Sequence, residues 1–148
     1  MEWKRAELKD GLLHAYVDIP AKTEKPTYTV LALHGIAFNS NVWHPLIKAK
    51  PDNVRFIAYN QRGYKGSSEA LKSGTTAGSM DVTFQLFLDM LYFMKFCVDE
   101  LGVEPVTQQD GHNTGGISLM ASRQNRHKRK LCLSYVLLRV GRKGLHNA

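Results

Sequence analysis

The sequence has few of the residues that mark a disulfide-rich or metal-binding protein. It contains only two cysteines, Cys97 and Cys132, which are too few and too far apart for a disulfide scaffold or a zinc site. The first ten residues are charged and contain no apolar core, so we expect no secretory signal. These absences favour a reducing compartment, and we expect the protein to be cytoplasmic.

Long uninterrupted apolar runs are also missing. Residues 81–101 are largely apolar, but Gln85, Asp89, Lys95 and Asp99 interrupt them. A membrane-spanning helix needs about 20 mostly apolar residues with few charges. We therefore predict a buried helix of a globular protein, ended by Gly102, and no membrane partner.

Acidic residues are absent from the last part of the chain. Residues 1–120 carry 12 Lys/Arg and 13 Asp/Glu, whereas residues 121–148 carry eight Lys/Arg and no acid. The net charge of +7 therefore belongs to the tail. The run Arg126 to Lys130 has no interleaved aromatic residues that could stack on bases. We expect a solvated basic surface there and no nucleic-acid partner.

The rest of the chain alternates strands with helices. We predict two short strands around the turn at residues 9–11, buried strands at 28–33 and 54–59, and a last strand from residue 131. Helices are predicted from a cap at Asn39, Ser40 or Asn41 through residue 47, over 81–101, and through Leu119 to Arg123. This alternation predicts an α/β fold with a mostly parallel sheet and flanking helices, in one domain of 148 residues.

Three segments in this order resemble the α/β-hydrolase family of the AB hydrolase-1 type. They are His34-Gly35-Ile36, which is similar to the family's oxyanion loop, the loop at residues 60–68, and Gly111-His112-Asn113-Thr114-Gly115-Gly116, which resembles the nucleophile elbow. The resemblance covers residues 6–123 and leaves 124–148 as an atypical basic tail. It implies an incomplete α/β-hydrolase fold, truncated after the elbow, in which 1–148 is the N-terminal portion of one domain.

The resemblance also implies where a catalytic site would lie. Ligands of open α/β sheets bind outside the carboxyl ends of the strands, where the three loops are expected to converge. Asn113 takes the nucleophile position, and the backbone N–H groups of Ile36 and Thr114 would form the oxyanion hole. His34 and Gly35 belong to the oxyanion loop, and we interpret His34 as a loop-ordering residue rather than a base. Arg62 either orients the second loop or is solvated, and the sequence leaves both interpretations open.

Asn113 makes this site unusual. An amide is not a nucleophile at neutral pH, whereas the family uses Ser, or Asp in members that open epoxides or displace halide. The 35 residues after Asn113 contain no Asp or Glu, and we expect His127 and His146 to be solvated. We therefore expect an ester or epoxide hydrolase by ancestry, acting on a small molecule, that is inactive or weakly active. The alternative is a non-catalytic module that binds a small molecule or a protein in the hydrolase pocket, and neither function implies a cofactor or metal.

Two features of the sequence conflict with this fold. The strand entering the elbow should be buried on both faces, yet residues 105–110 read Pro-Val-Thr-Gln-Gln-Asp. Burying such polar groups without partners costs on the order of 1–3 kcal/mol each. The strand predicted from residue 131 would be an unprotected apolar edge, and it leaves open self-association through that edge.

Overall fold

The computed structural model describes residues 2–24, 28–35, 38–71, 80–104, 107–109, 112–114, 117–124 and 131–135. In chain order the elements are β1 (Lys4–Glu7), the 3-10 helix η1 (Lys9–Gly11), β2 (Leu13–Ile19), β3 (Tyr28–Leu33), the 3-10 helix η2 (Ser40–Trp43), α1 (His44–Ala49), β4 (Val54–Tyr59), α2 (Met80–Asp99), β5 (Thr107–Gln109), β6 (His112–Thr114), β7 (Ile117–Gln124) and β8 (Leu131–Tyr135).

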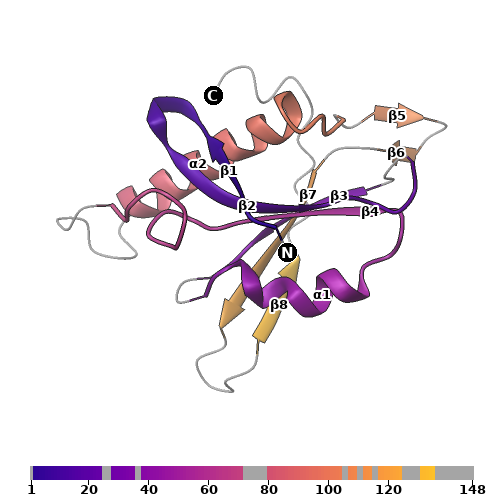
Figure 1. Ribbon diagram of the computed structural model, residues 1–148, viewed down its shortest axis with the longest axis horizontal. Coiled ribbons are helices and arrows are strands. Elements are labelled where there is room, and N and C mark those ends of the chain that lie inside the picture. Colours follow the sequence, from indigo (N-terminus) through magenta and orange to yellow (C-terminus); the bar gives the residue numbers. More distant parts are fainter. Residues whose placement is uncertain are drawn as a thin grey trace.

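Most of the strands form one six-stranded sheet in the order β1-β2-β4-β3-β7-β8 (Figure 1). The pairs β3–β4 and β3–β7 are parallel, and the pairs β1–β2, β2–β4 and β7–β8 are antiparallel. The α/β class is therefore confirmed, but the sheet is mixed rather than mostly parallel. A short connection explains the β1–β2 pair, because neighbouring strands joined by a tight turn can pair only antiparallel.

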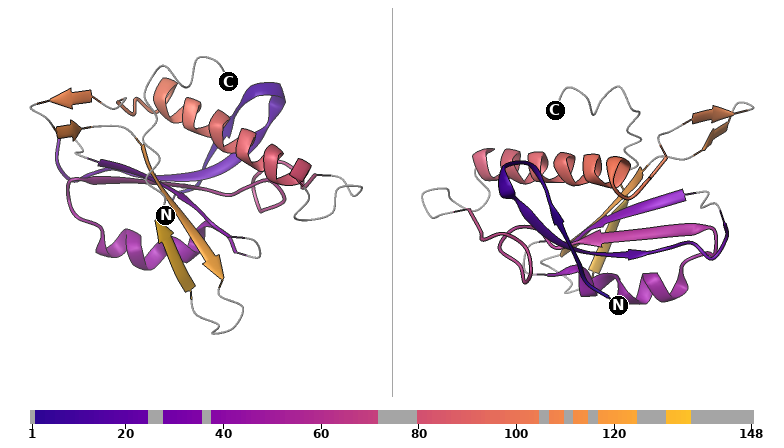
Figure 2. Two further views of the ribbon diagram at one scale, coloured as in Figure 1. Left: turned by 180° about the vertical axis from the view of Figure 1, so that it is seen from behind. Right: turned by 45° about the horizontal axis from the view of Figure 1, so that its top comes forward.

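Helices cover both faces of the sheet, as Figure 2 shows. On one face, α2 packs over a cluster that includes Leu31, Ile57, Phe93, Ile117 and Leu119. On the other face, η2 and α1 cover a smaller cluster around Trp43 and Phe56. The parallel strands β3 and β4 contribute to both clusters, which explains why their sequences are nearly continuously apolar.

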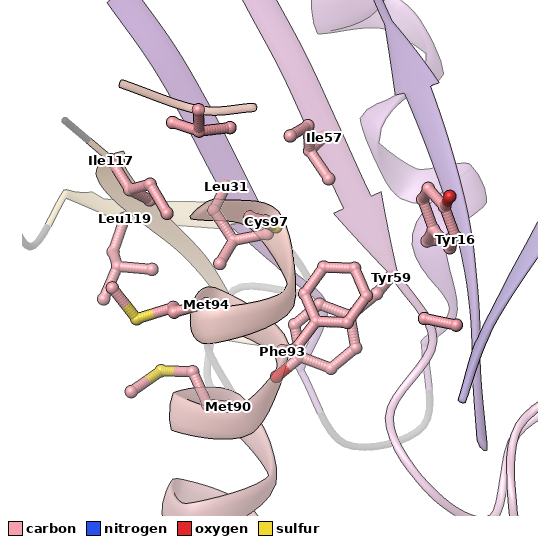
Figure 3. Packing of buried hydrophobic residues seen from close by; sticks show 12 residues of the cluster. Tyr16, Leu31, Ile57, Tyr59, Met90, Phe93, Met94, Cys97, Ile117 and Leu119 are labelled. Atoms are coloured by element: carbon pink, nitrogen blue, oxygen red, sulfur yellow. The ribbon is translucent and has the colours of Figure 1, made fainter. Parts of the chain in front are cut away.

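Aromatic rings form the centre of the α2 face. Phe93 stacks on Tyr59 with 4.4 Å between ring centroids, and the ring of Tyr16 meets Phe93 edge-on at 5.7 Å (Figure 3). All three side chains are buried. A ring pair of this kind adds about 0.5–1.5 kcal/mol to the free energy of burial.

Several predicted elements are confirmed, with ends that differ by about two residues. Asn39 caps η2, since its side chain accepts a hydrogen bond of 2.9 Å from the Asn41 N–H. The predicted long helix is α2, and Gly102 follows it with a φ of +62°, a conformation that glycine adopts without strain. The N-terminal turn has positive φ at Asp10 and Gly11.

The part of the chain after α2 differs from the prediction. The helix predicted through Leu119 to Arg123 is wrong, because residues 117–124 form the strand β7. β7 lies beside β3 in the sheet. Thr107–Gln109 instead pairs with His112–Thr114 in a separate two-stranded sheet. The physical reason is polarity: Ile117 and Leu119 of β7 are buried against α2, while the glutamines of β5 lie outside the main sheet.

Candidate functional site

The ends of β3 and β4 are tied together by His34 and Gln61. The Gln61 backbone N–H donates to Nε2 of His34 at 3.0 Å, and the Gln61 side-chain amide donates to the His34 carbonyl at 2.9 Å. Nδ1 of His34 lies 3.1 Å from the Gly35 carbonyl oxygen, within hydrogen-bond range. Because Nε2 accepts a hydrogen bond, the ring is the neutral tautomer with its proton on Nδ1.

Burial favours the neutral form of His34 as well. The residue is buried, and this burial lowers the pKa of its imidazole below the ordinary value. The ring of Tyr64 packs against it edge-on, with 4.4 Å between centroids. Both ring nitrogens are occupied by backbone groups, and this geometry supports the interpretation of His34 as a loop-ordering residue.

Asn60 makes four hydrogen bonds that hold the loop after β4 in place. Its side-chain oxygen accepts from the Ser40 N–H at 3.0 Å, and its side-chain nitrogen donates to the Lys65 carbonyl at 3.0 Å. Its own carbonyl accepts hydrogen bonds from the Ser67 hydroxyl at 2.6 Å and from Nδ1 of His14 at 3.0 Å. The residue is buried, so these four contacts satisfy polar groups that would otherwise be costly.

The glycine and serine residues of this loop dock it onto β2. The hydroxyl of Ser67 accepts from the Ala15 N–H at 3.0 Å, and that of Ser68 accepts from the Leu13 N–H at 2.8 Å. Gly66 has a φ of +85°, and a Cβ placed there would lie 2.8 Å from the Cβ of Ala15. Only glycine fits this turn at such a close approach of the two segments.

Arg62 anchors the same loop to α2. Its Nε donates to Oδ2 of Asp89 at 2.7 Å, and its Nη2 donates to Oδ1 at 3.0 Å. Gln85, one turn before Asp89, also donates to Oδ1 at 3.0 Å. Asp89 is only 2% exposed, so this is a buried, two-pronged ion pair. The structure thus decides the open question about Arg62: it orients the loop.

Asp89 is a residue that the sequence analysis missed as a partner. It was noted only as an interruption of an apolar helix. The signal available was its spacing, because Gln85 and Asp89 lie four residues apart and therefore share one helix face. A charged residue on a face that is otherwise apolar needs a partner, and Arg62 is the cation of the nearby loop.

A cavity of about 300 Å³ lies beside this ion pair. Its wall is formed by η1 and the residue after it, the loop after β4, and α2, with Lys9, Asp10, Gly11, Leu12, Arg62, Ser68, Gln85, Asp89 and Tyr92 as the lining residues. The Lys9 ammonium sits 5.3 Å from the centre of the Tyr92 ring. The cavity is therefore lined by one aromatic ring, by the cationic side chains of Lys9 and Arg62, and by the carboxylates of Asp10 and Asp89.

The predicted elbow does not join this region. Asn113 and Thr114 lie on β6, opposite Gln108 and Thr107 of β5. The parallel register places Ile117 beside Thr29 and Ala121 beside Leu33. Residues 112–114 therefore precede the amino end of β7, whereas His34 and Gly35 follow the carboxyl end of β3. His34 and Gln61 thus join the first two loops at this end of the sheet, as expected, whereas residues 112–114 of the third segment lie at the other end (Figure 1).

The remaining predicted site residues are only partly described. Ile36 lies outside the described residues, as do Gly111, Gly115 and Gly116. The backbone of Thr114 is described, and its role as an oxyanion donor stays a prediction. Among the residues with a described position, no three His, Cys, Asp or Glu side chains gather closely enough to hold a metal ion. No helix in this part of the chain is long and apolar enough to cross a membrane.

Comparison with known protein families identifies the fold. Residues 28–138 match the α/β hydrolase fold family. The chain therefore belongs to this family. A search of curated proteins gave no match.

Solved structures with a similar fold include epoxide hydrolases and haloalkane dehalogenases. An epoxide hydrolase of the α/β-hydrolase superfamily from a hot-environment metagenome is 29% identical with a TM-score of 0.52, and the match covers 71% of this chain and 31% of that one. An epoxide hydrolase from Vigna radiata is 21% identical with a TM-score of 0.54, over 81% and 31%. A haloalkane dehalogenase from Bradyrhizobium elkani is 21% identical with a TM-score of 0.51, over 81% and 32%. The chain thus spans about a third of the length of these proteins.

Proposed function

We propose that this chain is a non-catalytic member of the family, descended from an ester or epoxide hydrolase, with little or no hydrolytic activity of its own. The position of Asn113 is the observation that carries the proposal. It lies before the amino end of β7, while His34 and Gly35 follow the carboxyl end of β3. β3 and β7 run side by side for about 13 Å between these two ends. One reacting carbon atom therefore cannot contact both Asn113 and the loop at His34 and Gly35.

The chemistry of the available side chains supports the same proposal. Asn113 carries an amide, which has no nucleophilic lone pair at neutral pH. His34 uses both ring nitrogens in backbone hydrogen bonds. His14 is fully buried, and its burial lowers the pKa of its imidazole. A general base must lie within hydrogen-bond reach of the group it deprotonates, and neither histidine meets this requirement.

Restoring the nucleophile tests the proposal. The purified chain, Asn113→Asp and Asn113→Ser would each be assayed with styrene oxide and p-nitrophenyl acetate, with intact-mass spectrometry to detect an alkyl- or acyl-enzyme. We expect no turnover above buffer and no covalent adduct in any of the three. A full-length epoxide hydrolase serves as the positive control for the assay.

Asn41→Asp is the matched control, because Asn41 is an exposed asparagine far from β6 in the sequence. Turnover by the unaltered chain would refute the proposal outright. An adduct on Asn113→Asp that is absent from Asn41→Asp would show that the elbow forms and that the chain keeps latent catalytic geometry.

A second candidate function is binding of a small molecule without chemistry, and the cavity beside Asp89 favours it. A cavity of about 300 Å³ falls at the lower end of the range usual for ligand pockets. A thermal-shift screen of small carbonyl compounds and carboxylates tests this function. Binding in this cavity predicts that Tyr92→Leu abolishes the shift and that Phe87→Leu, at an exposed position of the same helix, preserves it. No shift from any compound would count against it.

A cytosolic location is part of the proposal. Its support is the low cysteine content and the buried free thiol of Cys97. Fractionation of cells that express the tagged chain tests this location, and recovery of the chain with secreted proteins would contradict it.

A further inference from the structure

The ion pair beside the cavity presents its cation to a ligand. The Asp89 side chain is only 2% exposed, whereas the Arg62 side chain is 19% exposed. Asp89 occupies one edge of the guanidinium, because it accepts from Nε and Nη2. The other edge, formed by Nη1 and the second N–H of Nη2, has no acceptor among the described residues. A guanidinium edge of this kind binds a planar carboxylate through two parallel hydrogen bonds.

Two further charges of opposite sign line the same cavity. They belong to Lys9 and Asp10, which are exposed residues of η1. Neither residue forms an ion pair within the part of the chain that the structure describes. The Lys9 ammonium lies over the Tyr92 ring instead, 5.3 Å from its centre. A ligand in this cavity therefore meets one unpaired cation and one unpaired carboxylate.

The uncharged part of the wall defines the rest of the ligand. Leu12 and the ring of Tyr92 supply apolar surface to the cavity. Its volume of about 300 Å³ suits a small molecule only. A matching ligand is therefore small, has an apolar body and carries both an anionic and a cationic group. An amino acid with an apolar side chain has these properties.

We propose that the cavity binds a small zwitterion of the amino-acid type. Its carboxylate pairs with the open edge of Arg62 and with the Lys9 ammonium, and its ammonium pairs with Asp10. Its apolar side chain lies against Leu12 and Tyr92. A simple acid or amine fits less well, because each would lack a partner for one of the two unpaired charges. This inference rests on the second candidate function, binding of a small molecule in this cavity, and adds the class of ligand to it.

Three ligands of similar shape test the proposal on the unaltered chain. L-Phenylalanine carries both charges, 3-phenylpropanoate lacks the ammonium, and 2-phenylethylamine lacks the carboxylate. Each is titrated into the full chain, and binding is followed by ligand-observed NMR. We expect saturable binding of L-phenylalanine. Binding of either analogue should be weaker by about tenfold or more, because each loses a charge-assisted contact.

Asp10→Asn tests the ammonium contact separately. Asparagine tolerates the φ of +59° at this position, so the turn is preserved while the charge is removed. We expect the variant to weaken binding of L-phenylalanine by about tenfold and not to weaken that of 3-phenylpropanoate. Asp52→Asn, at a carboxylate that is 64% exposed and outside the cavity, is the matched control and should change neither affinity.

Arg62→Lys tests the carboxylate contact. Lysine keeps a cation for Asp89 but has no planar fork for a second carboxylate. We expect L-phenylalanine and 3-phenylpropanoate to bind about tenfold more weakly, with 2-phenylethylamine unchanged. Circular dichroism checks the fold of this variant, and the three ligands on the unaltered chain test the same contact without any substitution.

The outcomes separate the ligand class from the cavity itself. Equal affinity of the three ligands, or unchanged binding of L-phenylalanine by Asp10→Asn, would overturn the proposal. If that binding were still lost in Tyr92→Leu, the cavity would bind small molecules without reading their charge, and the second candidate function would stand. Absence of L-phenylalanine binding, together with a thermal shift from another compound, would overturn the ligand class alone. No binding of any compound would overturn both.

Discussion

The loop after β4 and the segment after α2 are both rich in polar residues, yet only the loop keeps its polar residues at the main sheet. In the loop, Asn60, Gln61 and Arg62 stay at the end of the sheet because each finds a specific partner. After α2, Gln108 and Gln109 lie in a two-stranded sheet outside the main one, and β7 takes the place beside β3. The difference teaches that polar residues stay at the centre of this fold only where hydrogen-bond partners are provided, and that a more apolar segment otherwise replaces them.

Breaking the partnership of the first region should have the largest effect. Asp89→Asn keeps the shape of the side chain but leaves the Arg62 guanidinium without its counter-charge in a largely buried position. Removing one partner of a buried ion pair costs about 3–5 kcal/mol. We expect a loss of this size in the free energy of unfolding, measured by urea denaturation.

The ion pair between Lys95 and Asp99 on the same helix is the matched control. Its side chains are 44% and 48% exposed, and its N···O distance is 3.1 Å. Asp99→Asn should cost no more than about 0.5 kcal/mol, the usual value of an exposed helical pair. Equal losses in the two variants would show that Asp89 is no more important than a surface charge.

The second region can be tested by comparing β7 with β5. Leu119 of β7 is 6% exposed within the α2 cluster, so Leu119→Ala should cost about 2–5 kcal/mol. Gln108→Ala lies in β5, which is not part of the main sheet, and it should change the free energy of unfolding by less than about 0.5 kcal/mol. The same urea titrations measure both. A large effect at Gln108 with a small one at Leu119 would place residues 105–110 back in the main sheet.

The sequence was sufficient to predict β3, β4 and α2, and insufficient to predict the partner of Arg62 or the path of the segment after α2. Continuous apolar runs defined β3 and β4, and an Asn cap and a terminal glycine defined the helices, because these signals are local. The resemblance to the family led to the prediction of a helix after Asn113, although the polarity of residues 105–110 already conflicted with it. The choice between β5 and β7 depends on which segment packs better under α2, and this competition is not local. The pair of Arg62 with Asp89 was missed for the same reason, since 27 residues separate them.

The dependence of stability on pH should give the smallest effect, and it also belongs to the first region. Burial lowers the pKa values of His14 and His34, and near His14 the Asp89 carboxylate and the Arg62 guanidinium act in opposite directions. The unfolded chain binds protons at these histidines near pH 6.5, before the folded chain does. Stability is therefore complete above this pH and is lost as the pH falls below it, by at most about 1.4 kcal/mol per pH unit for each histidine.

The measurement is the urea midpoint between pH 7.5 and pH 5.5, where ordinary carboxylates remain ionised. His14→Asn keeps a donor for the Asn60 carbonyl, and His34→Gln keeps an acceptor for the Gln61 N–H, so the double variant should fold and show a flatter pH profile. His44→Asn, at an exposed histidine, is the matched control for the loss of one imidazole. An unchanged profile in the double variant would mean that the two histidines are protonated as readily in the folded chain as in the unfolded one, and that their hydrogen bonds do not hold them neutral.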